Sequence, residues 1–240
     1  MQLVEALMTK QPLLVCILVF CFAIAGFAQA SRFTMSFVPC FNAQPLQLGQ
    51  AYLLANINDS LTVEGFRFYV SGIKLLNSNK VVYEIPDGHY LLDAAHPQSQ
   101  TLQLNLPKPF IFDQIQFHIG IDSITNVSGA MGGALDPMNG MYWAWQSGFI
   151  NFKLEGTSPV CNSRNHKFQY HIGGYMPPFK ALQTVTFSCT NDQDLIVYIA
   201  LDKILGSIDL RLEPEIMSPS AKAISLSTII KQNFTNNIQP

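Results

Sequence analysis

QIQFHIGI (residues 114–121) gives the clearest indication of the fold. Apolar residues alternate with polar ones, so Phe117 and Ile119 point to one face of a strand and His118 points to the other. This period of two is typical of a half-buried β-strand. KFQYHI (residues 167–172) repeats the pattern, with His171 on the polar side. The sequence therefore predicts strands that bury one face only.

Strand-like segments continue on both sides of this one. Turn residues such as Asn77-Ser78-Asn79 and Pro86-Asp87-Gly88 separate them. Many short strands of this kind predict an all-β fold, a two-sheet antiparallel β-sandwich with long loops, and a barrel is the lesser alternative. Further strands are expected at 33–37, 66–76, 80–85, 90–93, 102–106, 148–154, 182–188, 195–201 and 208–212. Only two helices are expected, a short one near 43–55 and a C-terminal tail around 221–232.

The first 30 residues have the pattern of a cleavable signal peptide. Lys10 precedes an uncharged apolar run at 13–27, and Ala28-Gln29-Ala30 offers small residues at a cleavage site. The run is shorter than the about 20 residues of a membrane-spanning helix, which makes a permanent anchor the weaker interpretation. Residues 31–240 are then expected to form a single domain that is periplasmic or secreted, with no membrane span after cleavage.

Composition and motifs exclude several classes of function. The net charge is −2 and only 12% of residues are charged, so nothing indicates a nucleic-acid partner. The sequence has no nucleophile elbow, P-loop or dinucleotide-binding glycine motif. Glu155 follows the two tryptophans but lacks an obvious second acid for glycosidase chemistry. We therefore expect a protein that is not an enzyme.

Cys40, Cys161 and Cys189 remain after the signal peptide. A hairpin between 168–172 and 182–188 would bring Cys161 and Cys189 to the same end of a sheet. Export permits a disulfide, which requires Cα atoms within about 7 Å. The sequence thus predicts a Cys161–Cys189 disulfide and a free Cys40.

The segment 122–156 contains the most informative loop. Its first half is rich in Gly, Asn, Asp and Met and is too long for a simple hairpin, and long structured loops are usually functional. Asp136-Pro137-Met138-Asn139-Gly140 has the chemistry of a turn. Trp143 and Trp145, the only tryptophans, would lie on one face if this part were extended.

Residues in and around this loop resemble the MbnP-like family, exported copper-binding proteins named after a partner in methanobactin operons. The matching strings are LDP (135–137), GMYWAWQSGF (140–149), KLEG (153–156), FRFYVSGI (66–73) and YHIGG (170–174). The resemblance covers roughly residues 33–212 and implies a β-sandwich with a mononuclear copper site. It also implies that histidines bind copper together with a kynurenine, made when a partner dihaem enzyme oxidises a tryptophan. Trp143 or Trp145 would be that tryptophan.

The candidate ligands follow from this resemblance and from copper chemistry. Copper prefers imidazole, with thioether ligands for Cu(I). His171 lies in the matching YHIGG string, and His118 lies on the polar side of its strand. The residues expected at the site are His171, His118, Met141 and Asp136 as ligands, with Asp122 and Asn126 orienting them. His89 and His96 are the next candidates.

Two other functions remain open from the sequence. Trp143 and Trp145 could form a stacking platform for a sugar or another flat ligand in a ligand-binding β-sandwich. Alternatively, the chain could be a structural surface protein whose long loop is only packed. The copper-binding interpretation rests on the resemblance, because the histidines show no paired metal-binding spacing.

Overall fold

A computed structural model of the chain describes residues 31–190 and 194–236. The predicted signal peptide, residues 1–30, lies outside the described residues. The chain divides into two compact units. One consists of Met1–Ser31 and Asn105–Pro109, and its described part includes the end of strand β7 (Thr101–Leu106). The other unit, Arg32–Leu104 with Phe110–Pro240, contains the candidate site.

The described residues are mostly β, as the sequence predicts. The larger sheet contains β3 (Ala51–Leu54), β4 (Asp59–Asn77), β5 (Lys80–Glu84), β6 (His89–Asp93), β8 (Gln114–Ile119), β9 (Tyr142–Trp143), β10 (Gly148–Thr157), β11 (Lys167–Gly173), β14 (Gln183–Ser188) and β16 (Glu215–Ile216). The smaller sheet contains β1 (Ser31–Phe41), β2 (Gln44–Pro45), β7, β15 (Leu195–Ala200) and β17 (Phe234–Thr235). A separate hairpin is formed by β12 (Tyr175–Met176) and β13 (Phe179–Lys180).

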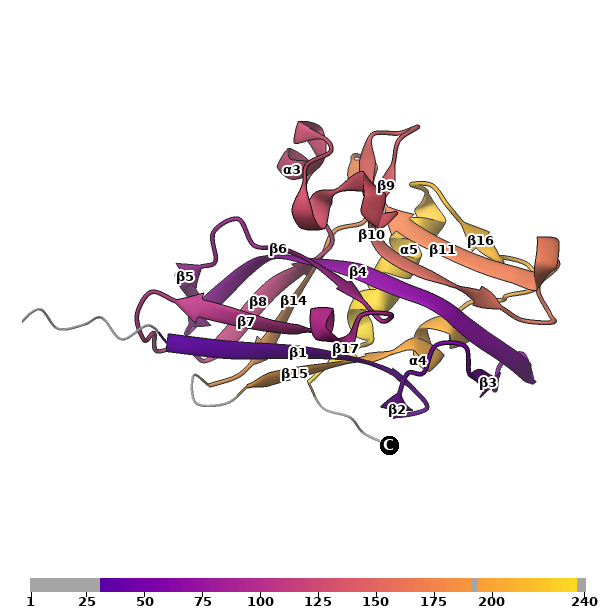
Figure 1. Cartoon of the computed structure of the whole chain (residues 1–240), viewed down its shortest axis with the longest axis horizontal. Helices are drawn as coiled ribbons and strands as arrows, with labels where there is room; N and C mark the ends of the chain where they lie inside the picture. The colour runs from indigo at the N-terminus through magenta and orange to yellow at the C-terminus, as the bar shows by residue number, and fades with distance from the viewer. Residues whose placement is uncertain (1–30, 191–193, 237–240) are drawn as a thin grey trace, which may run out of the picture. The chain divides into compact units, whose positions relative to one another are not determined.

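β4 is the long central strand of the larger sheet (Figure 1). One of its edges pairs with β10 and then, further along, with β8. The other edge pairs with β3, β6 and β5 in turn. Outside β10 and β8 lie β11 and β14 respectively. β10 and β8 both run antiparallel to β4, and their outer neighbours β11 and β14 run antiparallel to them. β11 and β14 therefore both run in the direction of β4, with β11 alongside its first part and β14 alongside its later part.

The strand pairing is mixed, whereas the sequence predicts an antiparallel sandwich. β1 runs parallel to β15, and β11 runs parallel to β16. Parallel neighbours need a crossover connection, which the alternation of polar and apolar residues within a strand does not reveal. The strand predicted at 208–212 is also wrong, because these residues form turns after the helix α4 (Leu201–Gly206).

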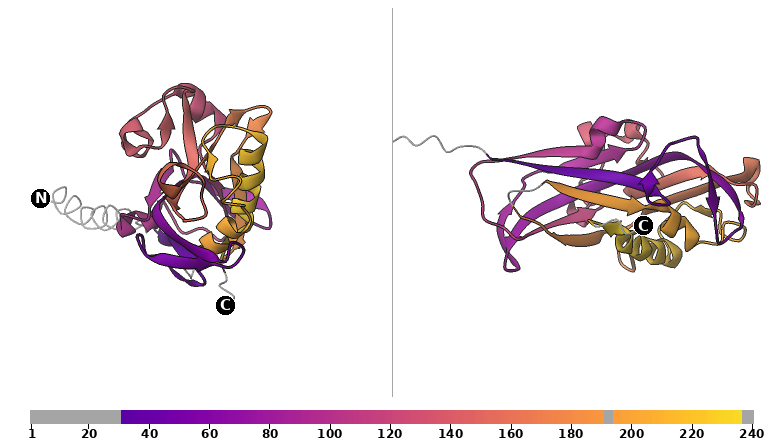
Figure 2. Two further views of the ribbon diagram at one scale, coloured as in Figure 1. Left: turned by 90° about the vertical axis from the view of Figure 1, so that its right-hand side faces the viewer. Right: turned by 90° about the horizontal axis from the view of Figure 1, so that it is seen from below.

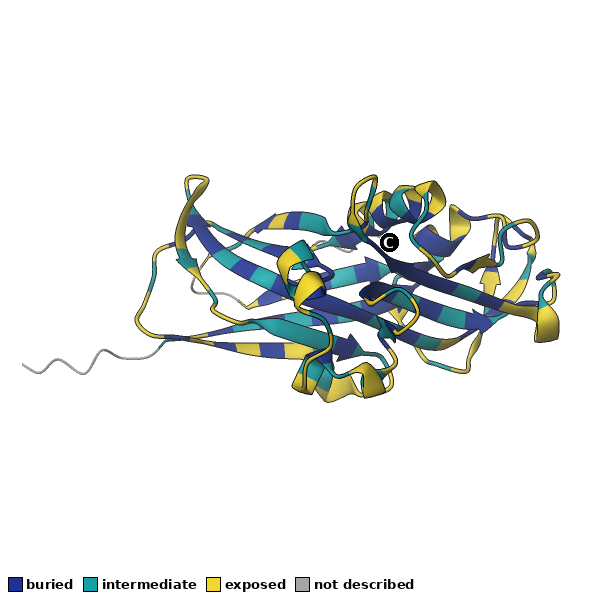
Figure 3. Cartoon of the chain, turned by 90° about the horizontal axis from the view of Figure 1, so that it is seen from above, coloured by how far each residue is buried: buried dark blue, intermediate teal, exposed yellow. Residues whose placement is uncertain are grey.

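Aromatic side chains fill the space between the two sheets. Phe37 of β1 contacts Phe68 of β4 and Phe117 of β8, with ring centroids 5.7 and 5.5 Å apart. Phe152 of β10 packs beside Phe66 on β4 at 5.1 Å. All five side chains are 1% exposed or less. Figure 3 shows the resulting alternation of buried and less buried residues along the strands. This inner core confirms the one-face burial that the period of two predicts.

Helices are few among the described residues. The C-terminal helix α5 (Ala221–Gln232) occupies the predicted range and packs against β11 and β14 (Figure 2). α3 (Ser123–Ser128) and α4 were not expected. The helix expected near 43–55 is wrong, because that range holds turns with β2 and β3. In the described part of the chain no helix has the length and apolar character needed to cross a membrane. The 3₁₀ turns are η1 (Pro97–Gln100), η2 (Gly133–Leu135), η3 (Pro137–Asn139) and η4 (Arg164–His166).

The predicted Cys161–Cys189 disulfide is wrong, and both cysteines are free, as is Cys40. The predicted hairpin does not form, because β11 pairs with β10 and β14 pairs with β8. Cys161 precedes β11 and Cys189 follows β14. Since the two strands follow one another in the same direction, the two cysteines lie at opposite ends of this edge. Each strand alone is about 20 Å long, far beyond the reach of a disulfide.

Candidate functional site

A row of polar residues crosses the outer face of the larger sheet. Asp93 on β6 pairs with Arg67 on β4, Arg67 pairs with Lys153 on β10, and Lys153 pairs with His171 on β11. Residues that pair directly across a sheet point to the same face. The inner neighbours of this row, such as Phe68 and Phe152, belong to the core. The row therefore lies on the face turned away from the inner core.

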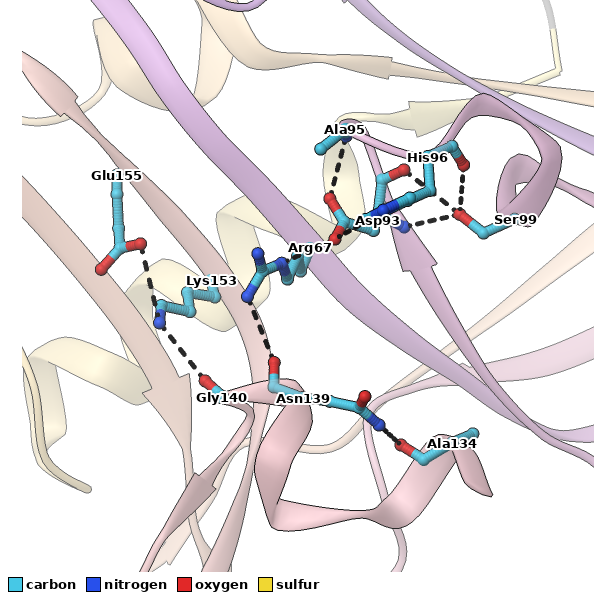
Figure 4. A network of polar contacts seen from close by, with 10 residues as sticks. All are labelled: Arg67, Asp93, Ala95, His96, Ser99, Ala134, Asn139, Gly140, Lys153 and Glu155. Atoms are coloured by element: carbon cyan, nitrogen blue, oxygen red, sulfur yellow. Dashed lines mark hydrogen bonds and ion pairs between the residues drawn. The ribbon is translucent and has the colours of Figure 1, made fainter. Parts of the chain in front are cut away.

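The loop between α3 and β10 is held on this face by hydrogen bonds to its backbone (Figure 4). Arg67 Nη1 donates to the carbonyl of Asn139 at 3.1 Å, and Lys153 Nζ donates to the carbonyl of Gly140 at 3.3 Å. Tyr69 Oη donates to the carbonyl of Ala134 at 2.9 Å. Arg67 is itself fixed by Asp93, 2.8 Å from its Nε. Three side chains of the outer face thus fix the loop that precedes the tryptophans.

Beneath this loop lies a second apolar cluster, which we call the loop core. Its buried members are Tyr69, Ile121, Leu135, Met141, Trp143, Phe149 and Ile150. Met141 is fully buried in it, and Trp143 is 6% exposed. The loop core explains why residues 68–71 of β4 are buried on both faces. It also shows that the Met141 side chain packs among apolar groups.

His171 forms a hydrogen-bonded pair with Glu155. Its Nε2 lies 2.8 Å from Glu155 Oε1, and the His171 side chain is 8% exposed. Burial alone would raise the pKa of Glu155, but the hydrogen bond from His171 and the charge of Lys153 outweigh it and lower this pKa to about 2. Glu155 is therefore ionised at neutral pH and can only accept hydrogen bonds. Nε2 must carry a proton to donate to this carboxylate, so when the ring carries a single proton, Nδ1 keeps its lone pair.

Trp143 packs against β11 two residues away from His171. His171 and Gly173 are two residues apart on β11, so they face the same side of the sheet, about 7 Å apart. The six-membered ring of Trp143 covers Gly173 so closely that a Cβ there would lie 2.8 Å from Trp143 Cζ3. The indole Nε1 of Trp143 is buried and has no hydrogen-bond partner among the described residues. Such an unpaired donor costs about 1–3 kcal/mol.

The two tryptophans do not form a flat platform. β9 ends at Trp143, and the following residues turn, so the chain is not extended through Trp145. The ring centroids are 5.9 Å apart, but the planes are inclined by 48°. Trp145 is 68% exposed, whereas Trp143 is buried. This geometry does not favour a stacking surface built from both rings.

His118 lies on the outer face but not beside His171. It pairs with Ser71 of β4, whereas His171 reaches β4 only through Lys153, which pairs with Arg67. The four-residue step along β4 alone is about 13 Å, too far for one ion with metal–nitrogen bonds of about 2 Å. His118 Nδ1 instead lies 2.9 Å from Thr184 Oγ1, and burial, followed by the charge of Lys74, lowers the pKa of His118. The expectation that the two histidines share one ion is therefore wrong.

The remaining expected site residues serve local structure. Asp136 caps η3 by accepting a hydrogen bond from the backbone N–H of Met138. Asp122 caps α3 and lies 3.9 Å from His89, so it does not orient His171. Asn126 is 3% exposed and accepts a hydrogen bond from the backbone N–H of Phe149.

The residue that orients His171 was missed by the sequence analysis. Glu155 appeared there only as an acid without a partner, and no local pattern links it to His171. The two residues meet because Glu155 pairs with Gln169 on β11, and His171 follows two positions later on the same face. Within residues 31–190 and 194–236, no group of three or more His, Cys, Asp and Glu side chains could hold a metal ion. The described side chains thus offer one imidazole nitrogen, two residues along β11 from the glycine that Trp143 covers.

Comparison with known proteins identifies related sequences and structures. The MbnP family model matches residues 30–218. The structure resembles that of MbnP from Methylosinus trichosporium with a TM-score of 0.57 and 16% sequence identity, over 76% of this chain and 80% of that one. At this identity, the structural likeness supports the fold alone. No curated protein matches the chain.

Proposed function

Because the chain belongs to the MbnP family, we propose that it is an exported copper-binding protein without enzymatic activity. The proposed site holds one copper ion beside His171 and Trp143, on the outer face of the larger sheet. The observation that carries this proposal is the position of His171: a buried imidazole held by a carboxylate, two residues along β11 from Gly173, which the buried Trp143 covers.

The His171–Glu155 pair has the form of an oriented metal ligand. Metal-binding histidines generally donate their second ring N–H to a carboxylate, a carbonyl or water, which fixes the tautomer and increases the basicity of the ligand. Glu155 has this role for Nε2, at 2.8 Å. Nδ1 of His171 makes no hydrogen bond with any described residue, so it is the nitrogen available to copper.

Trp143 would supply what the described side chains lack. An indole N–H is only a donor and cannot bind a metal ion as it stands. A kynurenine at this position would offer an aromatic amine and a ketone oxygen instead. The family resemblance assigns this oxidation to a partner dihaem enzyme. The unpaired Nε1 of Trp143 supports this site, because the indole gains no hydrogen bond there that oxidation would remove.

Copper content and intact mass test the proposal together. Protein isolated from the exported fraction of its native cells should contain one copper per chain, and one tryptophan should have lost a carbon and gained an oxygen. His171→Ala and Trp143→Phe should each abolish stoichiometric copper binding. Glu155→Gln should weaken copper binding about 10–100-fold, because it removes the charge that orients His171.

His96→Ala is the matched control, because it removes an imidazole whose side chain is 63% exposed and forms a polar contact with Asp93 on the surface. This variant should keep its copper. Circular dichroism should show that all the variants are folded. The proposal fails if folded His171→Ala binds one copper with the affinity of the wild type, or if native protein carries neither copper nor a modified tryptophan.

A further inference from the structure

A polar cavity of about 170 Å³ lies between β4, β10 and β11 on the outer face of the larger sheet. It opens where the register of β4 and β10 shifts, so that Glu64 is an extra residue that pairs with none on β10. Gly65 follows and gives the cavity a floor without a side chain. A Cβ on Gly65 would lie 3.6 Å from Glu155 Oε2 and within 4 Å of no other described group. The carboxylate of Glu155 therefore borders an open space above Gly65.

Charged side chains of both signs line this cavity. The cations are Arg67, Lys153 and Lys167, and the carboxylates are Glu64 and Glu155. Arg67 is already paired with Asp93, which is not part of the lining. Two ammonium groups and two carboxylates remain, so the charge that faces the cavity is balanced.

Two of these groups have hydrogen-bonding capacity that the described residues do not use. Glu155 Oε1 accepts from His171 and Gln169, whereas the nearest cation to Oε2, Lys153 Nζ, is 3.6 Å away, longer than a hydrogen bond. The ammonium group of Lys167 makes no ion pair with a described side chain. Lys167 lies two residues before Gln169, which pairs with Glu155, so Lys167 and Glu155 are diagonal neighbours on one face, about 7–8 Å apart. A free acceptor and a free cation thus border the same cavity.

We infer that this cavity binds a small free α-amino acid in its zwitterionic form. The ammonium group of the ligand donates to Glu155 Oε2 above Gly65, and its carboxylate accepts from Lys167. A ligand with a single charge fits less well: an anion would meet the ionised Glu155, and a cation would meet Lys153. A zwitterion gives each charge of the cavity a partner, which compensates the loss of hydration.

The size of the cavity agrees with a small amino acid. A cavity of about 150 Å³ accommodates benzene, and alanine has as many heavy atoms as benzene. The proposed copper ligand His171 does not line this cavity. The inference therefore goes beyond the copper function and does not depend on it.

The test uses metal-free protein at pH 6.5, because amino acids themselves bind copper. L-Alanine is titrated while the backbone N–H signals are followed by NMR. The signals of Gly65 and Lys167 should shift with saturation, whereas that of Val38 on β1 should not. N-acetyl-L-alanine lacks the ammonium group and L-alaninamide lacks the carboxylate. Each should bind about tenfold more weakly than L-alanine, which corresponds to about 1.4 kcal/mol.

Two variants assign the contacts. Lys167→Met should reduce the preference for L-alanine over L-alaninamide to about onefold, whereas Lys80→Met, at an exposed position on β5, should keep it tenfold. Gly65→Ala should abolish saturable binding, because its methyl group occupies the space above the floor. That methyl group makes only an ordinary contact with Glu155, so the variant should fold. Gly206→Ala, where a Cβ has nothing within 4 Å, is its control.

The wild-type protein alone can overturn the inference. If the Gly65 signal does not saturate with L-alanine, the cavity holds water only and the inference is wrong. Equal binding of N-acetyl-L-alanine would show a site for anions, and equal binding of L-alaninamide would show a site for cations. Either result would refute a zwitterion site without requiring any variant to fold, and neither would bear on the copper proposal.

Discussion

The inner core and the loop core contain similar side chains but are built by different means. Phe37, Phe68 and Phe117 meet between the sheets because alternating residues of each strand face inward. The loop core lies on the opposite face of β4, where Tyr69 is covered by Met141 and its neighbours. It exists only because a long loop lies over the sheet and is held there by polar side chains.

The inner core therefore holds the two sheets together, whereas the loop core supports the residues of the candidate site. The polar row beside the loop core has a structural task, because Arg67 and Lys153 donate hydrogen bonds to the backbone of the loop. The buried polar atoms without partners, however, occur here, at Trp143, Gln146 and Asn151. The described inner core has no such defect. Buried polar groups are almost always hydrogen-bonded, so packing alone does not explain these three atoms.

Phe68→Ala, in the inner core, is expected to destabilise the protein more than a substitution in the loop core or at the site. Phe68 is 1% exposed and contacts the rings of Phe37 and Phe234 in the smaller sheet. Its truncation should lower the free energy of unfolding by about 3–5 kcal/mol. Urea denaturation followed by circular dichroism measures the change. Ile111→Ala, at a side chain that is 79% exposed, should change the stability by no more than about 0.5 kcal/mol. Similar losses in both variants would contradict the assigned core.

The same comparison explains which part of the fold the sequence predicts. The alternation in residues 114–121 correctly places Phe117 inside and His118 outside, because a period of two requires only local geometry. The pairing partners do not follow from such a pattern. β14 joins β8 rather than β11 because the β12–β13 hairpin lies between β11 and β14 and lets the chain continue in the same direction. The predicted disulfide failed for this reason.

Only those site residues that lie within a short recognisable string of sequence could be predicted. The MbnP resemblance is confirmed, and it drew attention to the strings that contain Trp143 and His171. Their roles as copper-site residues stay predictions. The partner of His171 was not predictable, since Glu155 lies 16 residues away and meets it through the β10–β11 register. His118 is not a second ligand beside His171, because the strand pairing places the two histidines about four residues apart along β4.

Low pH should weaken the Glu155–His171 pair but not the contacts of the inner core. The pKa of Glu155 is about 2 in the folded protein, below its ordinary value of about 4.3. The stabilisation is therefore fully present above pH 4.3 and is lost as the pH falls towards 2. At pH 7, Glu155→Gln should lower the free energy of unfolding by about 1.5–3 kcal/mol, as expected for a hydrogen bond to a charged group. Urea titrations at pH 7, 4 and 2 should show this cost shrinking as Glu155 becomes protonated.

Two controls sharpen this prediction. Glu64→Gln changes an exposed glutamate on β4 and should have little effect at any pH. Phe68→Ala should cost a similar amount at pH 7 and pH 4, because no ionisable group contributes to that contact. If the cost of Glu155→Gln were the same at every pH, the carboxylate charge would not be what stabilises the His171 pair.

Met141→Leu is expected to have the smallest effect, and it decides whether this methionine packs or binds copper. Met141 is fully buried among the apolar side chains of the loop core. Leucine has a similar volume, so the exchange should cost less than about 1.5 kcal/mol. Copper content should stay at the wild-type level, because the proposed site uses His171 and Trp143. Met138→Leu, at a side chain that is 90% exposed, is the control from the same loop. A folded Met141→Leu variant that loses copper while Met138→Leu retains it would make Met141 a ligand, and the loop core would then be part of the metal site rather than its support.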